Sequence, residues 1–181
     1  MRVAVYGGSF NPPHVGHGMV AAWLRWTDRT DEVWLVPSFA HPFGRELAPF
    51  GRRLVLCQAL ARTVGPWVRV VPIESELPTP SYTWHVLQAL TARHPDHDFR
   101  LVVGADVAQQ TDRWHRFDAI QAHYDPIFVG RQGYPTPADA IDFPGVSSTE
   151  IRQRIARGAP IDHLVPQPVR AEMGTLYMEE P

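Results

Sequence analysis

The chain has 181 residues, of which 44% are hydrophobic and 20% charged, and its formal net charge is −2 at pH 7. That balance excludes the strongly basic surface typical of nucleic-acid-binding proteins, and no apolar run approaches the roughly 20 residues that span a bilayer. Gly7 and Gly8 interrupt the first apolar run, which argues against a signal peptide, and Cys57, the one cysteine, cannot form an intrachain disulfide. We therefore expect a cytoplasmic protein with neither nucleic acid nor a membrane as partner.

Strand-like and helix-like segments alternate along the first 130 residues. Continuous apolar runs, typical of strands covered on both faces, predict strands at 2–6, 32–37, 67–73, 99–104 and 126–130. Helical spacing of apolar residues predicts helices at Val15–Trp26, Phe50–Thr63, Tyr82–Arg93 and Val107–Ala122. This alternation predicts an α/β fold, a Rossmann-like doubly wound parallel sheet with helices on both faces.

The sequence of the last third of the chain predicts a loop followed by a small helical extension. Residues 131–146 contain three prolines and are predicted to form a loop, with a short strand near 141–143. A capped helix should follow, ending at Gly158, and one more should start near 166. We expect one domain over residues 1–181, with its C-terminal helical part at about 147–181. The residues able to cap the first of these helices are Ser147, Ser148 and Thr149.

The stretch "GGSFNPPHVGH", residues 7–17, joins the first predicted strand to the first predicted helix. Its glycines permit a tight turn and close approach of the backbone to a ligand. His14 and His17, three residues apart, fall on one face of the first helical turn, where free backbone N–H groups favour anions. Two imidazoles at such a helix start predict a phosphate site. Two simpler readings are a plain turn with surface histidines and an H-x-x-H zinc site, for which no further ligands are obvious nearby.

Two motifs at opposite ends of the chain resemble a known superfamily. Residues 8–17 match the G-x-F-x-P-x-H-x-G-H pattern of the HxGH-motif nucleotidyltransferases, and "VSSTEIR" at 146–152 resembles their I-S-S-T-x-x-R signature. Between them, "PSYTWHVL" at 80–87 and the G-A-D…W segment at 103–120 resemble the nicotinate (nicotinamide) mononucleotide adenylyltransferase family of that superfamily. The resemblance covers nearly the whole chain in the right order.

This resemblance implies an enzyme that transfers the adenylyl group of ATP to nicotinate mononucleotide, a step of NAD biosynthesis. Its substrates would be those two nucleotides, with Mg²⁺ as the cofactor, held mainly through phosphates and water rather than by protein ligands. The attacking phosphate is already a nucleophile at pH 7, so catalysis needs alignment and neutralisation of charge. The resemblance implies that the catalytic residues are His14, His17 and Arg152.

The resemblance also implies which residues bind each substrate. The ATP-binding set comprises Gly8, Ser9, Phe10, Gly16, Gly104, Asp106, Ser148 and Thr149. The mononucleotide-binding set comprises Arg45, Tyr82, Thr83, Trp114 and Arg131. Several of these have simpler readings: Asp106 and Thr149 as helix caps, Trp114 as a core residue, and Arg131 and Arg152 as surface arginines.

One departure from the family pattern leaves the acceptor open. The family commonly has a P-P-H-K segment after the second strand, whereas this chain has "SFAHPFGR" there and contains no lysine at all. Arg45 would then supply the cation, with a different phosphate geometry. Alternative acceptors are nicotinamide mononucleotide, phosphopantetheine or a CTP-dependent phospho-alcohol. A non-catalytic nucleotide sensor and a zinc-binding module are further alternatives, and a homo-oligomer is compatible with the sequence without being selected by it.

Overall fold

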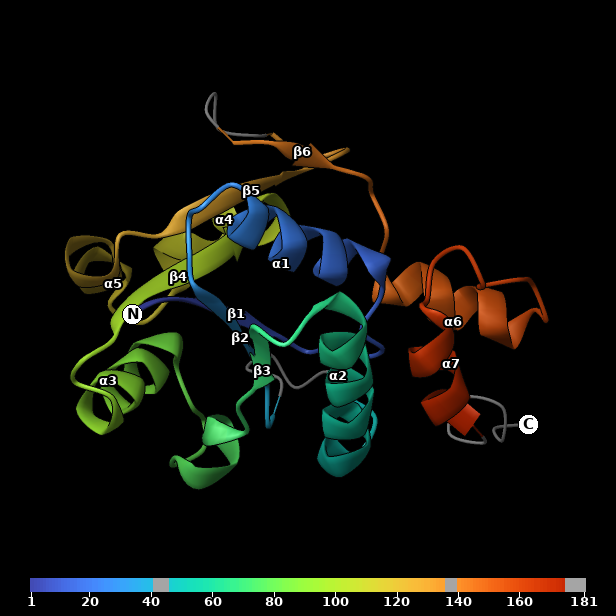
Figure 1. Ribbon diagram of the computed structural model, residues 1–181, viewed down its shortest axis with the longest axis horizontal. Helices are drawn as coiled ribbons and strands as arrows, with labels where there is room; N and C mark the ends of the chain where they lie inside the picture. The colour runs from blue at the N-terminus through green and yellow to red at the C-terminus, as the bar shows by residue number, and fades with distance from the viewer. Residues whose placement is uncertain (41–45, 136–139, 175–181) are drawn as a thin grey trace.

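The computed structural model describes residues 1–40, 46–135 and 140–174, and its centre is a parallel six-stranded sheet (Figure 1). The strand order is β3-β2-β1-β4-β5-β6, the order of a doubly wound dinucleotide-binding sheet. The predicted Rossmann-like α/β class is therefore confirmed. The strands are β1 (Arg2–Gly8), β2 (Glu32–Pro37), β3 (Val68–Val70), β4 (Asp98–Gly104), β5 (Ile127–Arg131) and β6 (Asp142–Phe143).

Alternate side chains of the central strand enter two separate hydrophobic cores. Ala4 packs in a core with Leu60 of helix α2, whereas Val3 and Val5 pack in a second core with Leu87 of helix α3. Because both faces of β1 are buried, its sequence reads as one continuous apolar run. The helices that contribute to the first core include α1 (Val15–Trp26) and α2 (Phe50–Val64), and those of the second are α3 (Thr83–Arg93) and α5 (Phe117–Tyr124).

The single helix predicted over Val107–Ala122 is wrong. The chain forms a short helix α4 (Ala105–Ala108), a 3-10 turn η2 (Thr111–Arg113) and then α5. Arg116 has a φ of +60°, a left-handed conformation that no α-helix can continue through. The spacing of apolar residues allowed a continuous helix, but the break leaves Trp114 free to pack edge-on against Phe117, with ring centroids 5.8 Å apart.

The strand predicted over 67–73 is shorter than expected. It ends at Val70, and a 3-10 helix η1 (Ile73–Glu76) begins directly after Pro72. Proline has no N–H to donate to a neighbouring strand, so the ladder stops there. This early exit places Glu74 beside the segment that follows β2, where its carboxylate accepts a hydrogen bond from the Phe39 amide.

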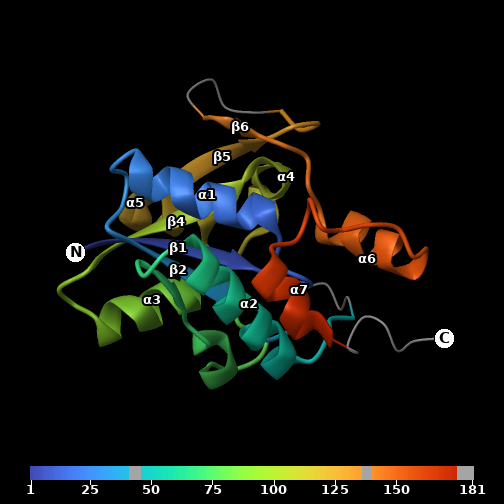
Figure 2. The ribbon, with the colours of Figure 1, turned by 45° about the vertical axis from the view of Figure 1, so that its right-hand side comes forward.

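Two helices, α6 (Ser148–Ala156) and α7 (Gln167–Met173), lie together at the end of the sheet where β1 ends (Figure 2). As predicted, the Ser147 hydroxyl caps α6 by accepting from the Glu150 amide at 3.0 Å. Gly158, at φ +66°, ends the same helix, with its amide donating to the Ile155 carbonyl. No helix among residues 1–40, 46–135 and 140–174 is long and apolar enough to cross a bilayer.

Candidate functional site

The first and last predicted motifs lie at the carboxyl ends of the strands, near the point where the strand order reverses. From β1 the chain crosses to β2 on one side of the sheet and later returns to β4 on the other, so the carboxyl ends of β1 and β4 flank the switch point. Open α/β sheets bind ligands at that point because the loops there diverge. Gly8 ends β1 and Gly104 ends β4, so both glycines lie at the carboxyl ends that flank the switch point.

His14 and His17 form a stacked pair at the start of α1. His14 occupies the N-cap position, and its backbone N–H donates to Nδ1 of His17 at 3.2 Å. The two ring centroids are 3.8 Å apart, and the Phe10 ring lies 4.8 Å from that of His17. Because Nδ1 of His17 accepts a hydrogen bond, the neutral ring carries its proton on Nε2. His17 is therefore prepared to donate from Nε2.

Burial keeps both imidazoles neutral in the absence of an anion. It lowers the pKa of His14 to about 3, with a further contribution from the positive charge of Arg131. Burial, the neighbouring His14 and Arg131 likewise lower the pKa of His17 well below its usual value. Nδ1 of His14 is buried without a hydrogen-bond partner among the described residues. A polar atom of that kind is ordinarily satisfied by a ligand or water, so the pair is suited to an incoming anion.

Small residues and a turned backbone make room for the histidine pair. A Cβ on Gly16 would lie 3.0 Å from Nδ1 of His14, and one on Gly8 would lie 3.3 Å from the Phe10 ring. Phe10 itself is buried with a φ of +46°, a conformation uncommon for any residue other than glycine. The loop is thus held in an unusual shape that keeps the imidazoles at the edge of the sheet.

The start of α6 is joined directly to this loop. The Ser148 hydroxyl donates to the Pro12 carbonyl at 2.8 Å, and Nη1 of Arg152 donates to the Asn11 carbonyl at 2.5 Å. The other Arg152 nitrogen, Nη2, lies 3.3 Å from the Thr149 hydroxyl that accepts from it. Residues more than 130 positions apart in the chain therefore meet beside the histidine pair.

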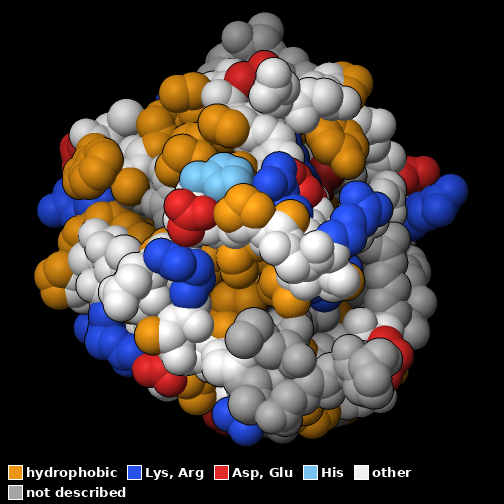
Figure 3. Space-filling view, turned by 90° about the vertical axis from the view of Figure 1, so that its right-hand side faces the viewer, with side chains coloured by type: hydrophobic (Ala, Val, Ile, Leu, Met, Phe, Trp, Pro, Cys, Tyr) orange, Lys and Arg blue, Asp and Glu red, His pale blue; other side chains and the backbone are white. Residues whose placement is uncertain are grey.

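Figure 3 shows the end of the molecule that carries α6 and α7, where blue side chains, all of them arginine in this chain, lie among hydrophobic and polar groups. Arg154 of α6 is paired with Glu150, one turn earlier in the same helix, at 2.9 Å. Arg152 instead reaches back to the loop after β1. Neighbouring arginines on one short helix thus have different partners.

Asp106 and Arg131 form an ion pair at the carboxyl edge of β4 and β5. Nη1 of Arg131 lies 2.6 Å from the Asp106 carboxylate, and its Nη2 donates to the Val146 carbonyl at 2.8 Å. The carboxylate folds back over Gly104, where an added Cβ would lie 2.7 Å from it. Arg131 therefore lies near the predicted ATP residues, and its charge acts on both histidines.

The predicted base-binding segments at Tyr82 and at Trp114 lie close to each other. Tyr82 is 40% exposed at the start of α3, and its ring centroid is 4.9 Å from that of His115, the neighbour of Trp114. The break between α4 and α5 brings these two segments together. Thr83 begins α3 directly after Tyr82. Arg45 lies outside the described residues.

Two residues that the sequence analysis did not single out connect the loops of the site. Arg53 of α2 is 1% exposed, and its guanidinium donates to the carbonyls of Ser9 at 2.9 Å and Ser38 at 2.7 Å. Glu74 accepts from the Ser81 hydroxyl at 2.8 Å, besides the Phe39 amide. Arg53 could have been recognised, because it lies three and four residues before the apolar Leu56 and Cys57 of the buried helix face. Glu74 carries no such periodic signal.

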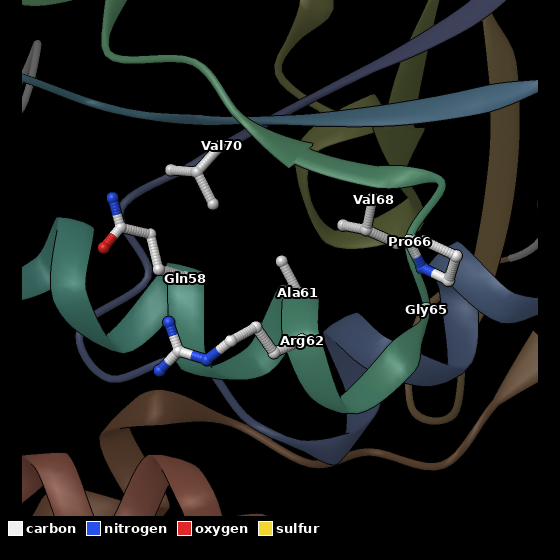
Figure 4. A pocket seen from close by; sticks show the side chains of 7 residues that line it. All are labelled: Gln58, Ala61, Arg62, Gly65, Pro66, Val68 and Val70. Carbon is white, nitrogen blue, oxygen red and sulfur yellow. The ribbon is translucent and has the colours of Figure 1, made fainter.

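A pocket lies elsewhere, between the second half of α2 and the edge strand β3 (Figure 4). Its lining is largely apolar, with Gln58 and Arg62 as its polar members, and includes none of the predicted site residues. Among the described residues, no three His, Cys, Asp or Glu side chains converge as metal ligands there or elsewhere. The lining residues are Gln58, Ala61, Arg62, Gly65, Pro66, Val68 and Val70.

Comparison with known proteins identifies the family of this chain. The sequence profile of the Cytidylyltransferase-like family matches residues 5–154. A protein described as "Probable nicotinate-nucleotide adenylyltransferase" from Anaeromyxobacter sp. (strain K) is 49% identical over 93% of this chain and 91% of its own length. A protein of the same description from Myxococcus xanthus (strain DK1622) is 40% identical over 92% of this chain and 88% of its own.

Solved structures share the fold. The Plasmodium falciparum nicotinic acid mononucleotide adenylyltransferase complexed with NaAD has a TM-score of 0.81 at 17% identity, covering 99% of this chain and 98% of that one. The same enzyme complexed with APC has a TM-score of 0.78 at 16% identity, with the same coverage. On the family profile and the two bacterial relatives together, this chain belongs to the nicotinate-nucleotide adenylyltransferase family of cytidylyltransferase-like enzymes.

Proposed function

We propose that this protein transfers the adenylyl group of ATP to nicotinate mononucleotide. An oxygen of the mononucleotide 5′-phosphate attacks the α-phosphorus of ATP, the bond from that phosphorus to the bridging oxygen breaks, and pyrophosphate leaves with the bond's electrons. The products are the deamido dinucleotide and pyrophosphate. The observation that carries this proposal is the neutral histidine pair at the start of α1, beside the helix that carries Arg152.

The triphosphate side needs donors rather than a base, because the nucleophile is already ionised. Nε2 of His17 would donate to the α-phosphate, where negative charge grows in the transition state. His14 would bind a neighbouring phosphate oxygen. Arg152 would exchange the Asn11 carbonyl for the β- or γ-phosphate and stabilise the leaving pyrophosphate. Backbone groups and hydroxyls of the remaining set complete the ATP site: Gly8, Ser9, Phe10, Gly16, Ser148 and Thr149.

Asp106 and Gly104 would meet the adenosine ribose or the water shell of a divalent ion. Mg²⁺ is the ion that we propose, since it binds phosphate oxygens and keeps several waters, with one or two protein carboxylates. It would neutralise charge on the triphosphate. Asp106, now paired with Arg131, is the carboxylate that we assign to that shell.

On the acceptor side, Trp114 would stack on the pyridine ring, with Tyr82 and Thr83 meeting its carboxylate. Arg45 would bind the mononucleotide phosphate, and Arg131, which lies near the histidines, would contact phosphate rather than base.

A phosphorylated small molecule and a nucleoside triphosphate as substrates, together with a free Cys57 thiol, favour the cytoplasm as the place of the reaction.

A pyrophosphate-release assay with a panel of substrates tests this proposal. We expect ATP with nicotinate mononucleotide to give the highest kcat/KM. Nicotinamide mononucleotide and phosphopantetheine with ATP, and a phospho-alcohol with CTP, form the comparison set. Faster turnover with phosphopantetheine, and none with either mononucleotide, would contradict the proposed acceptor while leaving nucleotidyl transfer intact. No pyrophosphate from any pair would contradict the reaction itself.

A further inference from the structure

Glu74 joins two segments that are 42 residues apart in the chain. The same carboxylate oxygen, Oε2, accepts from the Phe39 amide at 3.0 Å and from the Ser81 hydroxyl at 2.8 Å. Phe39 follows β2, and Ser81 immediately precedes Tyr82 and Thr83. One carboxylate therefore fixes the spacing between the loop after β2 and the start of α3.

The segment at Phe39 is also held from its other side. Nη2 of Arg53 donates to the Ser38 carbonyl at 2.7 Å and lies 3.4 Å from the Phe39 carbonyl. Burial raises the pKa of Glu74, while its hydrogen bonds from the Phe39 amide and the Ser81 hydroxyl and the charge of Arg53 act in the opposite direction. A cation and a carboxylate thus hold Ser38 and Phe39 between them, immediately before the stretch that contains Arg45.

One of the two joined segments carries residues of the proposed acceptor site. Tyr82 and Thr83, the residues that we assign to the pyridine base, directly follow Ser81. From these contacts, and resting on the proposed function, we infer that Glu74 is a positioning residue for the acceptor mononucleotide. It acts through the hydrogen bonds to Phe39 and Ser81, which hold the start of α3, with the proposed base-binding residues, against the segment that follows β2.

Steady-state kinetics of four variants test this inference. Glu74→Ala removes both hydrogen bonds, and we expect it to raise KM for the mononucleotide about tenfold or more while KM for ATP changes less than twofold. Glu74→Gln keeps a carbonyl oxygen at the same place, so it should restore KM to within about threefold of the wild type. Ser81→Ala removes one donor and should give an intermediate rise, which keeps the test available if Glu74→Ala folds poorly.

Glu76→Ala is the matched control. Glu76 lies on the same short helix η1 but is exposed and pairs with Arg93 at 2.6 Å, away from Phe39 and Ser81. We expect both KM values to stay at wild-type levels in this variant. A parallel rise of the two KM values in Glu74→Ala, or no rise in either, would overturn the positioning role.

Amide exchange separates this inference from the proposed function. The Phe39 amide should exchange slowly in the wild type and in Glu74→Gln, and at least tenfold faster in Glu74→Ala, whichever acceptor the enzyme uses. If the wild type prefers another acceptor, the same KM comparison is made with that acceptor. Unchanged Phe39 exchange in Glu74→Ala would refute the contact itself, independently of any activity.

Discussion

The start of α1 and the segments around Phe39 and Ser81 hold their groups by different means. At α1, His14 and His17 are three residues apart and are fixed by a hydrogen bond within one helical turn. Phe39 and Ser81, in contrast, are held by side chains of distant elements, Arg53 and Glu74. Local contacts of the first kind can be recognised in a sequence motif. Contacts of the second kind depend on how loops are brought together by the sheet.

The largest expected effect is on kcat and comes from the histidine pair at the start of α1, which is held by local contacts. His17→Ala removes the donor that we propose for the α-phosphate, and losing one preorganised transition-state donor should lower kcat by roughly 10²–10³. KM for either substrate should change little, because the interaction strengthens mainly in the transition state. Steady-state pyrophosphate release measures both parameters. His163→Ala, which changes an exposed side chain between α6 and α7, serves as the control and should keep wild-type kcat. A loss of kcat below about threefold would remove His17 from the mechanism.

The next largest effect is on stability and concerns the long-range hydrogen bonds of Arg53. Arg53→Met deletes a buried guanidinium and leaves the carbonyls of Ser9, Ser38 and Ala48 without this donor. We expect the free energy of unfolding, measured by urea denaturation, to fall by about 3 kcal/mol, the scale for several buried polar groups losing a shared partner.

The matched control for this variant is the preceding residue of the same helix. Arg52 is exposed, so Arg52→Met should change the free energy of unfolding by less than about 0.5 kcal/mol. Equal losses in the two variants would mean that the loops after β1 and β2 do not depend on Arg53. A loss confined to Arg53→Met would sharpen the contrast between the two sides of the site.

The smallest effect is the pH dependence of stability that the histidine pair imposes. Because the pKa of His14 falls to about 3 in the folded protein, from 6.5, the unfolded chain binds more protons between those values. This contribution to stability is complete above about pH 6.5 and is lost as the pH falls toward 3, with a slope of up to about 1.4 kcal/mol per pH unit.

Urea unfolding between pH 5.0 and 6.5 measures that slope. His14→Gln should give a shallower slope than the wild type in this window, and the two slopes should coincide between pH 7.5 and 8.5. Identical slopes at low pH would show that His14 is not held neutral. Saturating ATP should reduce the wild-type slope, since phosphate favours the charged imidazole.

Much of the fold was predictable because its signals are local. Continuous apolar runs predicted the parallel strands, and the capping pattern around Ser147 predicted where α6 begins, since both depend on near neighbours in the chain. The helix predicted over Val107–Ala122 was wrong because Arg116 adopts a left-handed conformation that apolar spacing does not reveal. The predicted roles of the site residues stay predictions, although the structure brings the first and last motifs together.

The sequence by itself determined the class of sheet and the placement of His14 and His17 on one helical face, because periodicity, glycine and capping act over a few residues. Only the tertiary structure decided that Arg152 meets Asn11, that Asp106 pairs with Arg131 and that Glu74 reaches Phe39. Those contacts join residues from 25 to 141 positions apart. Their geometry depends on strand order and on where each loop leaves the sheet, which no short stretch of sequence contains.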